Sequence, residues 1–97
     1  MHIAIRQYRI NPRNVDEVTQ KVRTGFVPLL RQCSGFVEYY WLNGGNGRVV
    51  SVGVFEDLAS AEASTRMAAD SVRQHLYELM RTPPEVMEGE VLLHDVT

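Results

Sequence analysis

Four segments of the chain either alternate apolar and polar residues or are rich in β-branched and aromatic residues, which predicts strands. They are residues 2–10, 36–42, 48–55 and 86–96. Residues 43–47, between the second and third segments, are all Asn or Gly. Because these residue types tolerate positive φ angles, they predict a hairpin that joins the two strands.

Two further segments repeat apolar residues at steps of three and four, the spacing of one helix face. The first helix is predicted to follow Asn11-Pro12, because Asn is a good N-cap and Pro is tolerated in a first turn. Gly25 and Pro28 predict a kink or a division of this helix into two. The second helix is predicted from Asp57, as its N-cap, to about Met80.

The resulting order is β-α-β-β-α-β, which is the plan of a ferredoxin-like α+β fold. Right-handed crossovers would place both helices on one face of a four-stranded antiparallel sheet. With 97 residues, the chain has room for a single domain spanning residues 1–97.

Composition excludes several functions. Ten Lys and Arg against 12 Asp and Glu give a net charge of −2, which argues against binding to nucleic acid or to an anionic membrane. No apolar run is long enough to cross a bilayer, and residues 1–10 do not resemble a signal peptide. A single cysteine excludes an internal disulfide. We therefore expect a cytoplasmic protein.

The second strand predicts a partner subunit. Its two faces carry Phe36, Tyr40 and Leu42 on one side and Val37, Tyr39 and Trp41 on the other. Neither face is polar, although helices are expected to cover only one of them. A homodimer packed sheet to sheet would bury the other face, and the alternative is a monomer that tolerates an exposed aromatic patch. Tyr39, Tyr40 and Trp41 then either line an aromatic pocket or anchor this interface.

Arg6 and Tyr8 are candidate ligand-binding residues, since they share a face of a strand that is expected to be central and apolar. Arg6 either binds an acidic group of a ligand or forms a cross-strand ion pair with Glu88 or Glu90. Ser51, on the third strand, is small and leaves space opposite.

His75 lies at the border of the apolar stripe of the second helix, between Val72 and Leu79. It either faces a cavity, as an acid, a base or an oxyanion ligand, or is a boundary histidine stabilised by the helix dipole. His2, His75 and His94 do not form a complete ligand set, so we expect no metal.

Several motifs resemble those of the antibiotic biosynthesis monooxygenase family, over nearly the whole chain. They are Arg6-x-Tyr8, the run Phe26-Val27-Pro28-Leu29-Leu30, Ser34-Gly35-Phe36, the run from Val52 to Asp57, the run from Ala59 to Glu62, and His75. The resemblance implies a dimeric α+β barrel.

The family resemblance also implies oxygenation of a small phenolic or quinol-like substrate without a bound cofactor. His75 would then be the catalytic residue that assists proton transfer, and Arg6, Tyr8, Tyr40 and Trp41 would bind the substrate. The alternative is a non-catalytic barrel that binds a small ligand or has a regulatory role.

Haem-degrading members of the family use an Asn on the first strand with a Trp and a His on the second helix. In this chain the only tryptophan, Trp41, lies on a predicted strand. The sequence therefore argues against haem degradation, and we expect a colourless protein.

Overall fold

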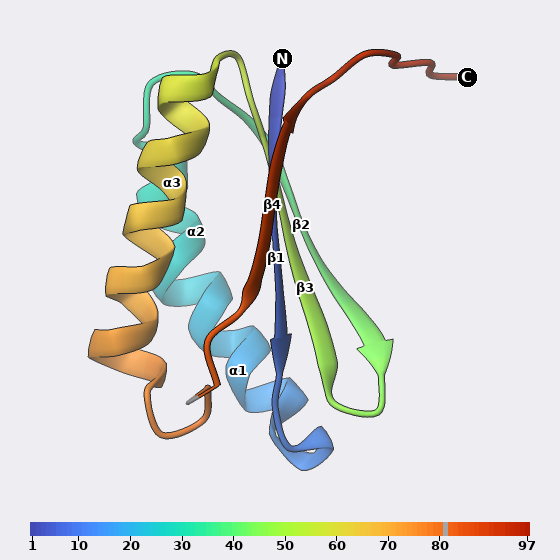
Figure 1. The fold of residues 1–97 in the computed structure, drawn as a ribbon. Coiled ribbons are helices and arrows are strands. Elements are labelled where there is room, and N and C mark those ends of the chain that lie inside the picture. Colours follow the sequence, from blue (N-terminus) through green and yellow to red (C-terminus); the bar gives the residue numbers. More distant parts are fainter. Residues whose placement is uncertain (81) are drawn as a thin grey trace.

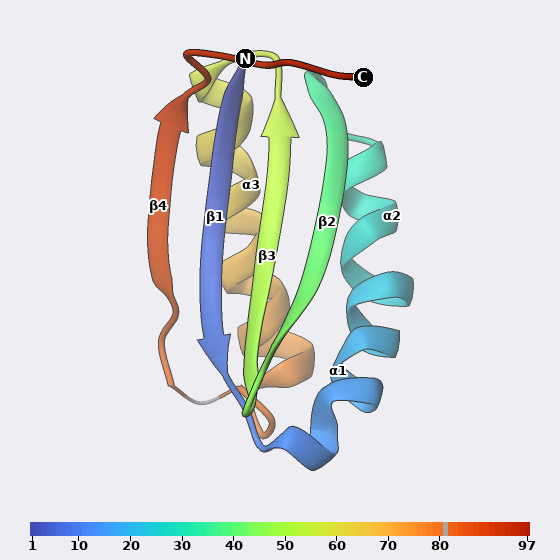
Figure 2. The same cartoon turned by 90° about the vertical axis from the view of Figure 1, so that its right-hand side faces the viewer.

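The four predicted strands pair into one antiparallel sheet in the computed structural model, which describes residues 1–80 and 82–97. They are β1 (His2–Arg9), β2 (Phe36–Gly45), β3 (Arg48–Phe55) and β4 (Glu85–Glu90). The order across the sheet is β2-β3-β1-β4, so β1 and β3 are central (Figure 2). Helices cover one face of this sheet and leave the other bare (Figure 1). The predicted ferredoxin-like α+β fold is confirmed.

The first helical region is divided, as Gly25 and Pro28 predict. A 3-10 turn at Pro12–Asn14 leads into α1 (Val15–Lys21), a π-helical segment at Val22–Phe26, and α2 (Val27–Arg31). The Asn11 side chain caps the start by accepting from the backbone N–H of Arg13 at 3.0 Å.

The second helical region consists of α3 (Leu58–Ser71) and a π-helical segment at Val72–Leu76. As predicted, Asp57 is its N-cap, and Oδ1 of its side chain accepts from the backbone N–H of Ser60 at 2.8 Å. This contact satisfies one of the free N–H groups of the first turn and lowers the pKa of Asp57.

The hairpin between β2 and β3 uses the predicted positive φ angles. Gly45, Asn46 and Gly47 have φ of 83°, 57° and 79°. Gly47 also packs against the end of β1, where its carbonyl accepts from the N–H of Ile10 at 2.8 Å. A Cβ atom at Gly47 would lie 2.1 Å from the Ile10 carbonyl oxygen, so this contact requires glycine.

The prediction of a last strand reaching Val96 is wrong, because β4 ends at Glu90. Its neighbour β1 begins at His2, which pairs with Glu90. A final bond from the N–H of Val91 to the Met1 carbonyl, 2.8 Å long, uses the last partner that β1 offers. Residues 92–97 then leave the sheet (Figure 1).

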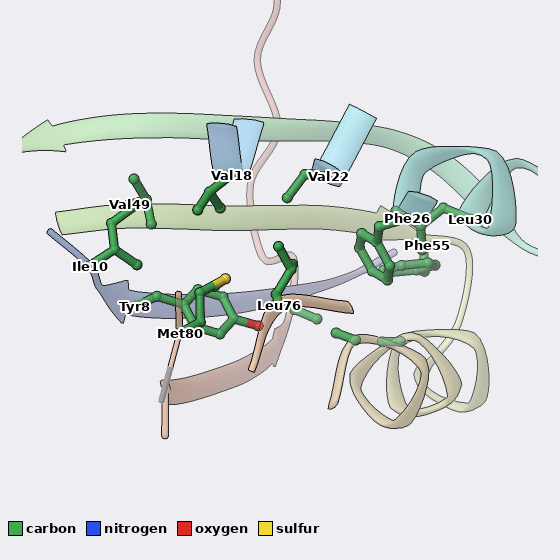
Figure 3. Packing of buried hydrophobic residues seen from close by; sticks show 13 residues of the cluster. Tyr8, Ile10, Val18, Val22, Phe26, Leu30, Val49, Phe55, Leu76 and Met80 are labelled. Atoms are coloured by element: carbon green, nitrogen blue, oxygen red, sulfur yellow. The ribbon is translucent and has the colours of Figure 1, made fainter. Parts of the chain in front are cut away.

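Side chains from the helices and from the inner face of the sheet form the core (Figure 3). Its larger members are Tyr8, Ile10, Val18, Val22, Phe26, Leu30, Val49, Phe55, Leu76 and Met80. Phe26, Leu30 and Phe55 gather toward one end, and Tyr8 lies beside Met80 and Leu76 (Figure 3).

The face of the sheet away from the helices is apolar. Cross-strand pairs place Ile5, Val52, Tyr40 and Met87 on it, and Tyr40 and Met87 are 49% and 69% exposed. Trp41 lies on the opposite, helix-covered face, so it does not belong to this bare surface.

Phe36 was expected on the face of Tyr40, and this prediction is wrong. A bulge between Phe36 and Glu38 reverses the alternation. The Phe36 ring therefore packs on Phe55, with centroids 6.0 Å apart.

Among the described residues, no helix is long and apolar enough to span a membrane.

Candidate functional site

The candidate site is built on one rung of the sheet. Arg6 of β1 pairs with Ser51 of β3, and Ser51 pairs with Trp41 of β2. Because side chains alternate between faces, all three point to the helix-covered side, where Tyr8 follows two residues after Arg6. Ser51 is small, which leaves room for the long Arg6 side chain between sheet and helices.

Arg6 is 2% exposed and has few partners. Its Nη2 donates to Ser51 Oγ at 3.1 Å, and its Cζ lies 5.6 Å from the centre of the Phe26 ring. Nε and Nη1 have no hydrogen-bond partner in the part of the chain that the structure describes. Buried donors of a charged group are almost always satisfied, so these two call for a partner from outside the chain, either a bound water or a ligand.

The alternative of a cross-strand ion pair is wrong. Glu88 is a neighbour on β4, but its carboxylate accepts the hydroxyl of Thr65 on α3. Within residues 1–80 and 82–97, Arg6 forms no salt bridge, either with Glu88 or with Glu90. The guanidinium charge is therefore not neutralised by the fold.

Two adjoining cavities border Arg6. The inner one has a volume of about 20 Å³, which is room for about one water molecule. The outer one has a volume of about 280 Å³ and opens between the second helical region and β4. The two cavities adjoin because the same four residues line both: Arg6, Tyr8, Val72 and Met80.

Both π-helical segments lie over the inner cavity. Val22 and Phe26, the ends of the first segment, line it, and so do Val72 and Leu76, the ends of the second. A π-helical turn widens the helix and redirects its side chains, and such turns are frequent at functional sites. The two helical regions are therefore irregular at the point where they cover Arg6.

Aromatic rings form the wall around Arg6. The Tyr39 ring packs edge-on against Phe26, with centroids 5.7 Å apart, and Tyr8 lies 6.4 Å from Trp41. Trp41 is fixed from outside by its Nε1, which donates to Thr19 Oγ1 at 2.9 Å. These contacts hold the rings in place without using the free donors of Arg6.

The two buried tyrosines remain neutral at ordinary pH. The hydroxyl of Tyr39 lies 2.8 Å from Ser51 Oγ, which also accepts from Arg6. Burial raises the pKa of Tyr39 to about 12, although the Ser51 contact and the Arg6 charge oppose this. Burial likewise raises the pKa of Tyr8, against the opposing charge of Arg6. Neither phenol therefore supplies a negative charge to Arg6.

The structure brings together three of the residues expected from the sequence and separates two others from them. Arg6, Tyr8 and Trp41 line the inner cavity. Tyr40 lies on the bare face of the sheet, where its hydroxyl donates to Glu38 at 2.6 Å. His75 is exposed on the helical layer and lines neither cavity next to Arg6.

Tyr39, which the sequence placed either in an aromatic pocket or at the interface, lines the inner cavity beside Trp41. The substrate-binding set that the family resemblance implies contains Tyr40 instead. The signal was present, because residues 39 and 41 must share one face of a strand. Trp41 and Tyr40 were never compatible as neighbours in one pocket.

No group of three or more His, Cys, Asp or Glu among the described residues could hold a metal ion. His94 lies beyond β4 in an exposed segment, and His2 lies at the start of β1.

A family model described as "Antibiotic biosynthesis monooxygenase" matches residues 1–74. No curated protein is significantly similar to the chain in sequence. Similarity to solved structures, in contrast, extends over nearly the whole chain.

One such structure is a protein of unknown function from Nitrosomonas europaea, with 18% identity, a TM-score of 0.81, and coverage of 99% of this chain and 93% of that one. A monooxygenase from Streptomyces coelicolor in complex with nanaomycin D has 15% identity, a TM-score of 0.79 and coverage of 99% and 91%. A MhuD mutant with two manganese protoporphyrin IX bound per active site has 17% identity, a TM-score of 0.79 and full coverage of both chains. At these identities the likeness shows the fold alone.

The buried hydroxyl of Tyr39 predicts a loss of stability at high pH. The pKa of Tyr39 is raised from 10.0 to about 12 in the folded protein, so between these values the unfolded chain ionises first. The stabilisation is complete below pH 10 and disappears as the pH rises to 12. Urea unfolding followed by circular dichroism should show the free energy of unfolding of the wild type falling in this range relative to Tyr39→Phe. Parallel curves for the two proteins would contradict the burial of this hydroxyl.

We expect that replacing Arg6 does not lower the stability of the fold. Arg6→Met removes a buried charge with two free donors and keeps an unbranched side chain of similar length. We expect the free energy of unfolding to stay unchanged or rise by about 1–3 kcal/mol. The control, Arg9→Met on the exposed end of the same strand, should change it by less than about 0.5 kcal/mol. A loss of more than about 2 kcal/mol in Arg6→Met would mean that Arg6 serves the fold rather than a ligand.

Proposed function

Because the chain belongs to the antibiotic biosynthesis monooxygenase family, we propose that it is a cofactor-independent monooxygenase of a small phenolic or quinol-like substrate. One observation carries this proposal. Arg6 is buried among aromatic rings, next to a cavity, with Nε and Nη1 unpartnered within the described residues. Nε and Nη1 point in different directions, and either donor, together with the positive charge of the guanidinium, suits the oxygen of a phenolate.

Binding beside Arg6 would activate the substrate. A positive charge favours the ionised form of a neighbouring acid, so Arg6 opposes the rise in pKa that burial causes in a bound phenol and makes its phenolate easier to form than in the same cavity without the charge. The low dielectric of the buried site strengthens this effect. The proton leaves to solvent through the outer cavity, and the phenolate that remains is rich enough in electrons to react with oxygen.

The reaction balances without an external reductant. A phenol and one O₂ give a quinone and one water: one oxygen atom forms a C=O bond with the ring carbon, and the other leaves as water. The substrate supplies all four electrons. Two protons are released, one from the phenolic hydroxyl and one from the ring carbon that is oxidised, and two protons taken up from solvent complete the water.

Each lining group has a part in this scheme. Arg6 holds the oxyanion and stabilises the negative charge as electrons move toward oxygen. Tyr8, Trp41 and Tyr39 restrict the plane of the substrate ring by packing around it. The apolar residues of the helical layer, Val72 among them, exclude water from the intermediate.

The residues next to Arg6 do not suit haem. No histidine or cysteine of the described chain lines either cavity. Tyr8, whose raised pKa keeps it neutral, is a poor ligand for iron. The proposal therefore includes no bound cofactor.

We also propose that the protein is a homodimer. The bare face of the sheet exposes Tyr40 and Leu42 at one edge and Met87 at the other, and apolar surfaces of this kind are characteristic of subunit interfaces. A second copy packed on this face would give a barrel with both helical layers outside and both Arg6 sites intact.

The enzyme proposal predicts oxygen uptake that depends on Arg6. With a panel of phenols and hydroquinones, an oxygen electrode should record consumption of one O₂ per quinone formed. Arg6→Met should lower kcat/KM at least about 100-fold, because the oxyanion loses its charge partner. Arg9→Met should leave it unchanged.

His75→Ala separates this proposal from the role that the family resemblance implies for His75. Since His75 lies outside the cavities next to Arg6, activity through Arg6 alone predicts no change, whereas a proton-transfer role predicts lost turnover. Binding of phenols with no oxygen uptake in the wild type would contradict the enzyme proposal. It would favour a non-catalytic ligand-binding barrel.

The dimer proposal predicts a mass of twice 11.0 kDa by light scattering after size exclusion. Leu42→Glu on the bare face should dissociate the dimer, because it would bury a carboxylate without a partner. Leu58→Glu is the matched control, since the two leucines are 48% and 46% exposed and Leu58 lies on the helical layer. A wild-type monomer at micromolar concentration, or equal masses for the two variants, would contradict this interface.

A further inference from the structure

The outer cavity carries a second cation, and we propose that Arg73 binds a carboxylate of the substrate there. The substrate class would then be aromatic acids that also carry a phenolic hydroxyl. This inference rests on the proposed function for the assignment of the hydroxyl to Arg6. The carboxylate site itself depends only on the outer cavity and its charges.

The two arginines occupy different depths of the outer cavity. Arg6 is buried at its inner end, where the inner cavity adjoins. Arg73 lies in the π-helical segment of the second helical region, and its side chain is 69% exposed. A ligand that fills the outer cavity therefore has the buried guanidinium of Arg6 at its inner end and also borders Arg73, whose exposed side chain can turn from Asp70 toward it.

The charge of this cavity has one sign. Arg6 and Arg73 line it, and in the part of the chain that the structure describes no Asp or Glu does so. The protein as a whole carries a net charge of −2, so this local excess of positive charge is not a general property of its surface. A cavity lined with one sign of charge and low-dielectric walls attracts the opposite charge.

Arg73 is free to exchange its present partner for a ligand. It pairs with Asp70 one turn earlier on the helical layer, and both side chains are more than half exposed. Exposed ion pairs of this kind contribute little stability. Asp70 itself borders a different depression, beside His75, and does not line the outer cavity.

The region between the two arginines suits an aromatic ring. Its walls include the apolar side chains of Val72, Met80, Pro84 and Val86. A volume of about 280 Å³ lies just below the range of about 300–1,000 Å³ that is typical of small-molecule sites, so it suits a small ligand. A ligand of one or two fused rings, with an acidic group at each end, matches this shape and charge.

Calorimetric titration with two naphthalenes tests this inference without relying on turnover. 6-Hydroxy-2-naphthoate and 2-naphthol share one ring system and one hydroxyl and differ in the carboxylate. We expect the wild type to bind the acid about tenfold more tightly than the naphthol, as one charge-assisted pair allows. Arg73→Gln should reduce this preference to less than about twofold and leave the Kd of 2-naphthol unchanged.

Three further variants identify the charge responsible. Arg66→Gln removes the same charge from α3 outside the cavity and should keep the preference for the acid. Arg73→Lys should retain part of it, since a charge remains without the planar fork. Asp70→Asn, which frees Arg73, should preserve or increase it.

Equal affinities of the wild type for the two naphthalenes would overturn the inference. An equal effect of Arg73→Gln on both ligands would also overturn it, because it would indicate a structural role. The outcome is separable from that of the proposed function. A preference for the acid that depends on Arg73, without oxygen uptake, would support the carboxylate site while contradicting the monooxygenase.

Discussion

A buried guanidinium on a central strand is the constraint around which this small domain is arranged. Removing an arginine from water costs several kcal/mol even after the protein relaxes. Here one hydrogen bond to Ser51 and the face of the Phe26 ring offset part of that cost. Ala4 and Tyr8, two residues before and two residues after Arg6 on the same face of β1, are uncharged, so the strand itself does not require a charge on this face. The unfavourable burial is best explained by a ligand that supplies the missing partner.

The layers of the fold follow from this site and from the bare face of the sheet. Helices must cover Arg6 closely enough to exclude water, yet leave a volume beside it. The two π-helical segments, Val22–Phe26 and Val72–Leu76, meet both requirements, since each lines the inner cavity with its first and last residue. The opposite face of the sheet has no such task, and its centre, with Ile5, Val52 and Tyr40, is apolar, as expected of a surface that another subunit covers.

Much of the fold was predictable from the sequence, because alternation and helical spacing are local signals. The strands, the divided first helix and the hairpin glycines all followed from them. The end of β4 was not predictable, since it depends on where β1 begins. The bulge after Phe36, which moves that residue to the other face, was not predictable either, because it depends on how β2 pairs with β3. For the site, Arg6, Tyr8 and Trp41 could be selected from strand faces. The position of His75 could not, because a border residue on a helix turns toward or away from the core according to packing alone.

The most direct test is a crystal structure of the protein with 6-hydroxy-2-naphthoate. The ligand's hydroxyl oxygen should lie about 2.7–3.2 Å from Nε or Nη1 of Arg6, with its ring against Tyr8 and the helical layer. The Ser51 contact of Nη2 should persist, because it uses a different donor. A structure in which the ligand lies elsewhere, or in which a carboxylate of the protein occupies the free donors of Arg6, would contradict the account.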